Sequence, residues 1–435
     1  GRNIEVITMH NKLIKFLNNV HSEYHCVEEV SKILANNHFK EVSLDNDLTL
    51  EAGENYYFKT SASLIAFKIP KNIKTNYYYK IVASHLDSPT LKVRRLKETK
   101  TNLYNSLEVE IYGGPILSTF FDKPLGLAGK VVINDNNTLK THLVDLKKSF
   151  IIPNVPIHLN RELNNGYIYN KDNELKPLIS LGDESSLIEL LAKELKINKE
   201  AIAAYDLETY NQTPAQVGGL NDEFIYGSRL DNLASIYLSV EGLLSSKEEG
   251  INLIALFNNE EIGSKTIEGA DSTLLELILK RINHSLNKND EELSSSLKRS
   301  FLISLDNAHA LNPNRSDLYD TQPVIINSGI VIKHNSNMLY ISSPLSVALV
   351  KLIASNNNIP YQEYYNKTSQ RGGSTLGALL NSHLNILGVD LGLGQLAMHS
   401  SYEVGGIKDL DYMYLFLNKF FNTPLEINGQ EIKIK

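Results

Sequence analysis

The sequence predicts an α/β protein in which a mixed, mostly parallel sheet is flanked by helices and interrupted by a β-rich insert. Three observations favour this fold. Several apolar runs end at a carboxylate or an imidazole. Strand-like and helical runs alternate after Arg229. Between residues 91 and 220 the sequence instead contains short β-type runs separated by turn residues. Because 435 residues exceed what one core usually supports, we expect two domains. Residues 1–90 and 221–435 would form one domain, and residues 91–220 the insert.

The first ninety residues combine helices with strands. Helical spacing of apolar residues over 12–37 predicts one or two amphipathic helices. Alternation over 57–59 and 64–67 predicts strands, and the apolar run 79–83 predicts a strand that leads into His85.

The insert carries short β-type runs between Gly-Gly and Asn/Asp turns. These runs predict strands over 107–112, 127–133 and 141–144. Helical spacing predicts a helix near 185–195, and His158 lies between these elements.

After Arg229 the chain returns to alternating helices and strands. Helical spacing follows Arg229 directly, and apolar runs at 251–257, 301–305 and 387–391 predict buried strands. The polar segment 287–300 is typical of an exposed loop or helix end. Catalytic groups gather at the carboxyl ends of the strands in open α/β sheets, so residues just after these runs are the candidates for a site.

Two adjacent acids, Glu260 and Glu261, follow the apolar run 251–257. Ionised carboxylates are costly beside a core unless a metal or hydrogen bonds compensate them. In an extended exit segment the two side chains would point in opposite directions, so that one can bind a metal while the other acts as a base. Two solvated acids at the start of a loop are the alternative.

Candidate metal ligands stand near the ends of the other runs. Two imidazoles and three carboxylates suit zinc or another borderline divalent ion, and the full set is His85, Asp231, Glu261, Asp306 and His399. If Asp231 bridges, two metal ions each receive three protein groups and Glu260 is left as the general base. Asp87 follows His85 by two residues, which would place it on the same face of the strand. It can accept the second N–H of the His85 ring and fix its tautomer. The alternatives are a hydrogen-bonded His85 and a helix N-cap role for Asp231.

Composition excludes several classes of function. The net charge of −7 and the lack of a Lys/Arg cluster argue against a nucleic-acid partner. No apolar run approaches the ~20 residues that span a bilayer, and no phosphate-binding glycine fingerprint is present. The single Cys26 excludes a Cys-based zinc site and fits a reducing, cytoplasmic compartment.

The chain also resembles the M18 family of metallopeptidases, the aspartyl aminopeptidase family, within the clan of co-catalytic dizinc exopeptidases. Eight segments carry the resemblance in family order over nearly the whole chain: SHLDSP (84–89), YGGPILSTFFDKPLGLAGKV (112–131), VPIHLNR (155–161), SRLDNL (228–233), FNNEEIGS (257–264), SLDNAHALNPN (304–314), RGGSTLG (371–377) and QLAMHSSYE (395–403). The resemblance implies the ligand roles above, a catalytic domain in two parts, and an insert used for dimerisation. It further implies dimers that assemble into a dodecamer.

The resemblance leads to an expected function, a zinc metalloaminopeptidase that removes N-terminal residues, preferably Asp or Glu, from peptides. Three alternatives stay open. They are an aminopeptidase of neutral or broad specificity, a dizinc deacylase or carboxypeptidase on the same scaffold, and a catalytically idle shell protein. The complete set of ligands and the base argue against the third.

Four residues are candidates for substrate contact. Lys333 follows the apolar run 329–332, so we expect it just after a strand. The family places a cation for acidic side chains at Lys333 and uses the equivalent of His158 to complete a neighbouring subunit's site, whereas a solvated lysine and a structural histidine are the alternatives. His309 can contact substrate or belong to the core. Gly373 lies in a Gly372–Thr375 segment expected to open a helix whose N–H groups hold an anion or a carbonyl, unless it forms a plain turn. Leu339 and Tyr402 replace two arginines that are usual in the family.

Overall fold

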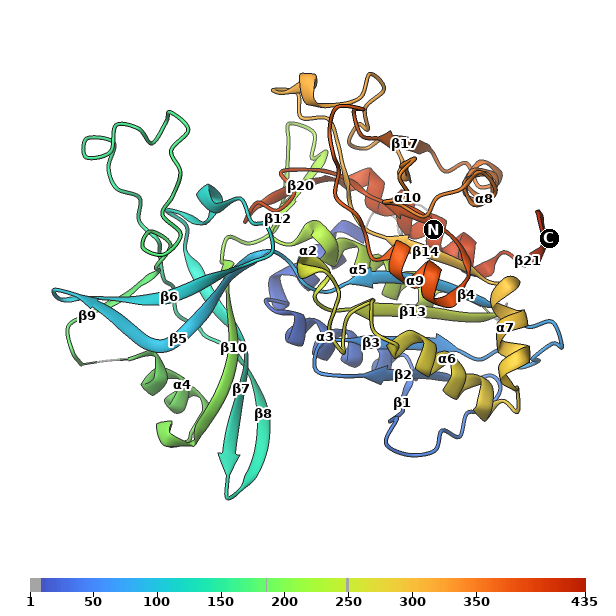
Figure 1. The fold of residues 1–435 in the computed structure, drawn as a ribbon, viewed down its shortest axis with the longest axis horizontal. Helices are drawn as coiled ribbons and strands as arrows, with labels where there is room; N and C mark the ends of the chain where they lie inside the picture. The colour runs from blue at the N-terminus through green and yellow to red at the C-terminus, as the bar shows by residue number, and fades with distance from the viewer. Residues whose placement is uncertain (1–8, 185, 248–249) are drawn as a thin grey trace.

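The computed structural model describes residues 9–184, 186–247 and 250–435 (Figure 1). It is a mixed α/β protein, as predicted. Within the described residues the main sheet has nine strands, in the order β1 (Lys40–Glu41), β2 (Asn55–Lys59), β3 (Leu64–Lys68), β13 (Ile251–Phe257), β4 (Tyr79–His85), β14 (Phe301–Leu305), β18 (Leu387–Gly392), β16 (Ile330–His334) and β17 (Tyr361–Tyr365). The four strands predicted from apolar runs are therefore confirmed.

The centre of this sheet is parallel. Strands β13, β4, β14 and β18 run in one direction, while β3 and β16 pair antiparallel with β13 and β18. All seven residues of β4 and all seven of β13 are buried, as expected for strands covered on both faces. The carboxyl ends of these central strands consequently meet at one edge of the sheet.

Helices cover both faces of the main sheet (Figure 1). One face packs against α2 (Met9–Asn19), α3 (Glu23–Asn36), α5 (Leu230–Leu244), α8 (Pro344–Asn356) and α10 (Ile407–Asn422). The other face packs against α6 (Leu274–Ser285), α7 (Asp290–Lys298) and α9 (Gly377–Leu384). Among the described helices, none is long and apolar enough to cross a membrane.

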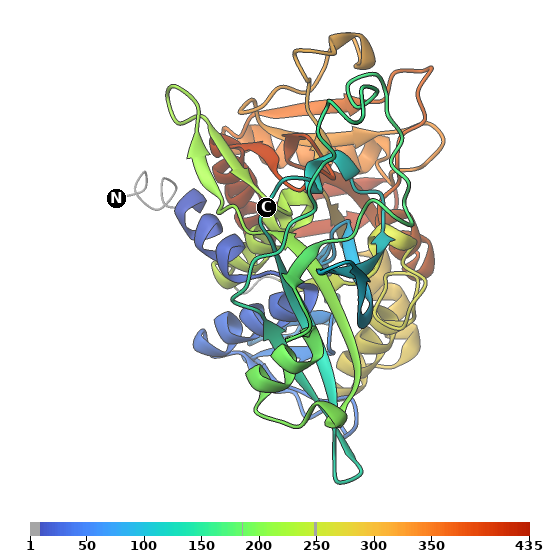
Figure 2. The same cartoon turned by 90° about the vertical axis from the view of Figure 1, so that its left-hand side faces the viewer.

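A second sheet stands to the left of the main body in Figure 1 and faces the viewer in Figure 2. Its strands, as far as the chain is described, are β8 (Thr138–Asp145), β7 (Leu125–Asp135), β10 (Ile202–Asn211), β5 (Thr90–Thr101), β6 (Tyr104–Tyr112) and β9 (Leu178–Leu181). Helix α4 (Leu187–Leu195) packs on it and is followed by the short turn η2 (Lys199–Ala201), while the turn η1 (Leu117–Phe120) lies between β6 and β7. The helix predicted at 185–195 is thus present, although Ser185 lies outside the described residues.

A smaller sheet carries the chain from the insert back to the main body. In the described chain it contains β11 (Gln216–Gly218), β12 (Phe224–Gly227), β20 (Glu403–Gly406), β19 (Gly394–Leu396) and β15 (Ala308–His309). The predicted insert boundary at residue 220 falls in the turn between β11 and β12. The turns η3 (Glu260–Ile262) and η4 (Ser316–Leu318) and the hairpin β21 (Leu425–Asn428) with β22 (Glu431–Ile434) complete the elements.

Two local predictions were wrong. The polar segment 287–300 contains helix α7, because Asn289 and Glu292 form a capping box that a reading of polarity alone overlooks. The segment Gly372–Thr375 does not open a helix, since α9 begins only at Gly377.

Candidate active site

The candidate site forms where three neighbouring parallel strands end. His85 is the last residue of β4 and is paired with Phe257, the last residue of β13. Asp306 directly follows β14, which lies on the other side of β4. The sheet therefore delivers His85, Asp306 and the Glu260–Glu261 turn to one place, as the positions of the apolar runs predicted.

The exit from β13 differs from the extended segment that we expected. Asn259 has a left-handed backbone (φ 61°), and Glu260 and Glu261 form the 3₁₀ turn η3. The two carboxylates consequently lie on the same side. Glu260 Oε2 is 3.5 Å and Glu261 Oε1 is 4.0 Å from His85 Nε2.

The five predicted ligands form two groups that share Asp231, and a third group joins Glu260 to His85 and Glu261. In the first group, His85 Nε2 lies 3.4 Å from Asp231 Oδ1 and 3.4 Å from Asp306 Oδ1. In the second, His399 Nε2 lies 3.2 Å from Asp231 Oδ2 and 3.4 Å from Glu261 Oε2. The two oxygens of one carboxylate thus face two different imidazoles.

The donor set fits divalent cations. Three buried atoms at the centre of the site have no hydrogen-bond partner among the residues that the structure describes: His85 Nε2, Asp231 Oδ1 and Glu261 Oε1. An unpaired buried polar atom costs about 1–3 kcal/mol, and cations bound among these donors would satisfy all three. All five side chains are oxygen or imidazole nitrogen donors, which zinc accepts.

The pKa values of the buried carboxylates and of His85 also indicate a site that requires cations. Burial raises the pKa of Glu260 to about 8, against the lowering effect of His85, and burial and Asp231 raise the pKa of Glu261 well above its usual range. Burial alone would lower the pKa of His85, but the carboxylates of Glu260 and Asp306 raise it well above its usual value. Without cations, the excess of carboxylates is therefore relieved by protons.

Asp87 is held as the partner of His85, although not from the same strand as expected. Strand β4 ends at His85, and Asp87 turns back from the following loop so that its carbonyl oxygen lies 3.0 Å and its Oδ1 3.3 Å from His85 Nδ1. The backbone N–H groups of Glu260 and Glu261 donate to Asp87 Oδ1 and Oδ2 at 3.2 and 3.0 Å. Asp87 thereby links the orientation of the imidazole to the position of both glutamates.

Tyr112 is a contributor that the sequence analysis missed. It ends β6 in the second sheet, and its hydroxyl donates to Asp87 Oδ2 at 2.6 Å. Asn259 Nδ2 donates in turn to the Tyr112 hydroxyl at 3.1 Å. Tyr112 opens the YGGP motif, which was a usable signal, whereas its contact with Asp87 depends on how the two sheets are placed.

Glu403 is the second residue that was missed. It lies four residues after His399, is only 2 % exposed, and accepts backbone N–H groups from both Asp231 (3.1 Å) and His399 (2.8 Å). The His399 ring is held from its other side, where Nδ1 lies 3.1 Å from the Gly114 carbonyl oxygen. The sequence shows an acid four residues after the candidate ligand His399, but it does not show that the Glu403 side chain points toward Asp231 and His399.

Two glycines permit the close approach of backbone around the site. A Cβ at Gly392 would lie 1.8 Å from the carbonyl oxygen of Asp306. Gly113 has φ +71°, and a Cβ there would lie 3.2 Å from Glu261 Cβ. Side chains at these positions would displace a candidate ligand.

The four predicted substrate contacts are only partly brought together. His309 and Gly373 line one cavity of about 260 Å³ beside Tyr364. Lys333 lies inside β16, not after a strand as we expected, and is 2 % exposed, so it is not a solvated lysine. His158 is exposed in the insert, and none of the contacts found in the described chain joins it to the site.

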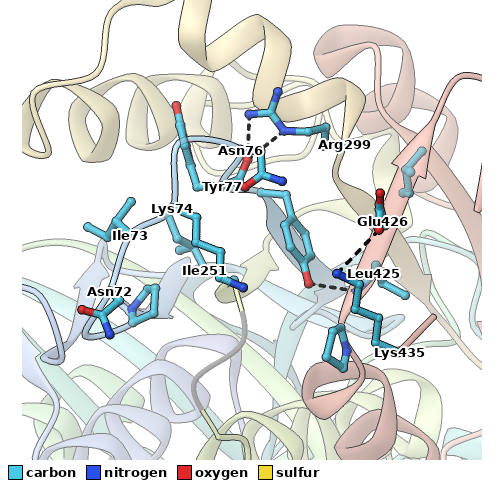
Figure 3. Close-up of a pocket in the computed structure, with 15 residues that line it drawn as sticks. Asn72, Ile73, Lys74, Asn76, Tyr77, Ile251, Arg299, Leu425, Glu426 and Lys435 are labelled. Atoms are coloured by element: carbon cyan, nitrogen blue, oxygen red, sulfur yellow. Dashed lines mark hydrogen bonds and ion pairs between the residues drawn. The ribbon is translucent and has the colours of Figure 1, made fainter. Parts of the chain in front are cut away.

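A larger cavity of about 450 Å³ lies at the opposite edge of the main sheet (Figure 3). It is lined by residues that precede β4 and β13, including Tyr77 and Gly250. Its cations Arg299 and Lys435 already contact the Tyr77 carbonyl oxygen (3.0 Å) and Glu426 (3.6 Å). Catalytic side chains at strand carboxyl ends cannot reach this cavity, so it is separate from the candidate site.

Known proteins are similar to this chain over most of its length. The family profile described as Aminopeptidase I zinc metalloprotease (M18) matches residues 16–421. The chain is 35% identical over 424 residues to a probable M18 family aminopeptidase 2 from Clostridium novyi, covering 95% of this chain and 98% of that protein. It is 33% identical over 469 residues to aspartyl aminopeptidase 4 from Saccharomyces cerevisiae, covering 96% and 95%.

A solved structure extends the similarity to the fold. The cryo-EM structure of the Ape4 and Nbr1 complex contains a chain that superposes with a TM-score of 0.92 at 31% identity, covering 96% of this chain and 86% of that one. The predicted family resemblance and the prediction of a zinc metalloaminopeptidase are thereby confirmed. This chain belongs to the M18 family of zinc metalloproteases, the aminopeptidase I family.

Proposed function

We propose that this protein removes N-terminal residues, preferably acidic ones, from peptides at a site that holds two zinc ions. The observation that carries the two-ion proposal is the placement of Asp231, with Oδ1 3.4 Å from His85 Nε2 and Oδ2 3.2 Å from His399 Nε2. His85, Asp231 and Asp306 would hold one ion, and Asp231, Glu261 and His399 the other. When bound, the two ions would polarise the scissile carbonyl and lower the pKa of the attacking water.

The remaining steps belong to side chains of this chain. Glu260 belongs to neither of the two groups that contain Asp231, although it forms a third group with His85 and Glu261 and its Oε2 lies 3.5 Å from His85 Nε2. We propose that it takes a proton from the attacking water and passes it to the leaving amine. Asp87 acts as a positioning residue, because it orients His85 and anchors the turn that carries Glu260.

The proposed preference for Asp and Glu depends on Lys333. Its ammonium group donates to the Asn307 carbonyl oxygen at 3.0 Å, which leaves further donors of the same group for a substrate carboxylate. Asn307 directly follows the proposed ligand Asp306, so the hydrogen bond to Asn307 holds the Lys333 ammonium group near the metal site. The yeast relative's name, aspartyl aminopeptidase, is in line with the preference. We propose His309 and Gly373 as further substrate contacts because they share a cavity.

One assay series tests the proposed function. The metal-free and zinc-loaded protein should be compared on chromogenic substrates carrying Asp, Glu, Asn, Gln, Leu or Ala with a free amino group. We expect zinc-dependent cleavage that is fastest for Asp and Glu. Cleavage of N-acetylated substrates, or release of C-terminal residues, would instead indicate a deacylase or a carboxypeptidase. A preference for Leu or Ala would indicate a neutral or broad aminopeptidase.

We also propose that residues 91–220 form a dimerisation domain and that dimers assemble into a dodecamer in the cytoplasm. The segment near His158 exposes large apolar side chains that a subunit contact would cover, namely Val155, Ile157, Leu159 and Ile168. His158 would then act in a neighbouring subunit's site. Mixed assemblies of His158→Ala and Glu260→Gln proteins should regain activity if this is correct, whereas no recovery in verified mixed assemblies would leave His158 a structural residue.

A further inference from the structure

Glu403 contacts the candidate site without belonging to either group of ligands. It is the first residue of β20 and is 2 % exposed. Its carboxylate contacts the backbone of Asp231 and of His399. Its Oε1 accepts the backbone N–H of Asp231 at 3.1 Å, and its Oε2 accepts the backbone N–H of His399 at 2.8 Å. One carboxylate thus holds the main chain of two ligands that are far apart in sequence.

These two ligands lie in irregular backbone and need such support. Asp231 has non-helical angles (φ −87°, ψ 102°) at the beginning of α5, and His399 has a left-handed backbone (φ 72°) between β19 and β20. Neither is fixed by the ladder of a sheet or by the regular part of a helix. Small displacements of either backbone would change the distance between Asp231 Oδ2 and His399 Nε2, which is 3.2 Å.

We propose that Glu403 is a positioning residue that sets the separation of Asp231 and His399 and thereby maintains the second metal site. The proposal rests on the proposed function, in which these side chains hold an ion together with Glu261. Second-layer partners of metal ligands commonly change metal affinity by about 10- to 100-fold when they are removed.

The hydrogen-bond pattern requires a carboxylate. Gln395 Nε2 also donates to Glu403 Oε2, at 2.9 Å, so that three donors meet two acceptor oxygens. An amide in place of the carboxylate would turn its NH₂ group toward at least one of these donors. Glu403→Gln should therefore push the backbone of Asp231 or His399 out of place with almost no change in side-chain volume.

Gln395 connects the Glu403 carboxylate to Lys333, the proposed substrate cation. We call the Glu403 carboxylate, with the backbone N–H groups of Asp231 and His399 that it accepts, the clamp. Its Oε1 accepts a hydrogen bond from Asn307 Nδ2, and the Asn307 carbonyl oxygen accepts from Lys333 Nζ at 3.0 Å. A continuous series of polar contacts hence runs from Lys333 to the backbone of both ligands.

The chain offers a matched control for a buried carboxylate that only stabilises a loop. Asp409 is 1 % exposed and likewise accepts two backbone N–H groups, from Asn327 at 2.7 Å and Gly329 at 3.0 Å. None of these three residues is a candidate ligand. Asp409→Asn should lower the Tm and leave zinc affinity unchanged.

The test is a zinc titration against a competing chelator, together with the Tm of each metal-free variant. For Glu403→Gln we expect the second zinc equivalent to bind about 10- to 100-fold more weakly, with a smaller effect on the first, because the first site shares only Asp231. Glu403→Asp keeps the charge but is one methylene shorter, so it should also weaken the second equivalent, and it serves if Glu403→Gln does not fold. Wild-type affinity for both equivalents in either folded variant would overturn the proposal.

The same titration separates this inference from the proposed function. If the wild-type protein binds only one zinc ion, the two-ion mechanism is wrong and the clamp has no second site to maintain. If the wild-type protein binds two and both Glu403 variants also bind two with unchanged affinity, only the role of Glu403 is wrong. An equal loss of zinc affinity in Asp409→Asn would show that general destabilisation explains the effect and would likewise overturn the proposal.

Discussion

Asp231 Oδ2 lies 3.2 Å from His399 Nε2, while the other oxygen of the same carboxylate is turned away from His399. That second oxygen, Oδ1, lies 3.4 Å from His85 Nε2 and has no hydrogen-bond partner of its own. A carboxylate placed between two imidazoles in this way can serve two cations at once. Its removal should therefore affect both sites together.

Asp231→Asn should weaken both zinc sites, since an amide offers one acceptor oxygen in place of two. Metal analysis after dialysis should find fewer than one zinc ion per subunit. Asp306→Asn is the matched control, because Asp306 belongs only to the group with His85. It should empty one site and leave the other filled. One intact site after Asp231→Asn would contradict the bridging role.

Glu260→Gln should lower kcat by at least about 100-fold and retain both zinc ions. The amide preserves the shape of the side chain but cannot accept the proton. Glu261→Gln provides the comparison, because Glu261 Oε2 lies 3.4 Å from His399 Nε2 as a member of the second group. That variant should lose zinc. Loss of zinc from Glu260→Gln instead would mean that the roles of the two glutamates are reversed.

The positions of the candidate ligands could be predicted because they depend on strands that are buried and parallel. Apolar runs located β13 and β14 with their observed bounds, and the ends of these runs located Glu260 and Asp306. Parallel pairing then brings the carboxyl ends together without further information. Apolar runs do not predict backbone geometry that local turns set. At Glu260, a left-handed Asn259 begins a 3₁₀ turn where an extended segment was expected.

Tyr112 and Glu403 could not be assigned a role from the sequence for a different reason. Tyr112 reaches Asp87 from the second sheet, and Glu403 reaches Asp231 across 172 positions of the chain. No periodicity encodes such contacts. Lys333 shows the reverse error, because a lysine at the end of an apolar run was placed outside the strand that in fact contains it. Its burial is compensated by contacts that only the tertiary structure supplies, with the Asn307 carbonyl oxygen and the Tyr340 ring.

Tyr112→Phe should reduce kcat by about 10-fold, with a smaller change in KM, because Asp87 would lose one of the donors that orient it toward His85. The hydroxyl donates to Asp87 Oδ2 at 2.6 Å. Tyr205→Phe is the control, since the Tyr205 hydroxyl also donates one hydrogen bond in the second sheet, to the Arg94 carbonyl oxygen at 2.9 Å. Equal kcat values for the two variants would show that the Tyr112 hydroxyl does not contribute to catalysis through Asp87.

Zinc binding should release protons, and zinc affinity should rise with pH up to about 8. Burial raises the pKa of Glu260 to about 8 and that of Glu261 well above its usual range, so that both hold protons in the metal-free protein at neutral pH. Cations favour the ionised carboxylates, so binding must displace these protons and is weaker where they are more firmly held, at lower pH.

Calorimetry in buffers of different ionisation enthalpy measures this proton release. Glu260→Gln should release fewer protons and still bind zinc, because the amide does not titrate. A heat of zinc binding that does not depend on the buffer, between pH 6 and 8, would show that the carboxylates are already ionised in the metal-free protein.

Lys333→Met should remove the preference for acidic N-terminal residues and spare slow cleavage of neutral ones. A carboxylate that enters a partly dry pocket loses its hydration and requires a compensating cation. A hydrogen bond to a charged group contributes about 1.5–3 kcal/mol, so the ratio of kcat/KM for Asp over Asn should fall by about 10- to 100-fold.

Lys68→Met is the matched control for this substitution. Lys68 Nζ donates to the carbonyl oxygens of Leu244 (3.2 Å) and Ser246 (2.8 Å), and Lys68 ends β3, away from the ligands. Its removal should not change the Asp over Asn ratio. If Lys333→Met keeps the wild-type ratio, then the ammonium group only supports the Asn307 carbonyl oxygen, and acidic selectivity must come from other donors in the cavity that His309 and Gly373 line.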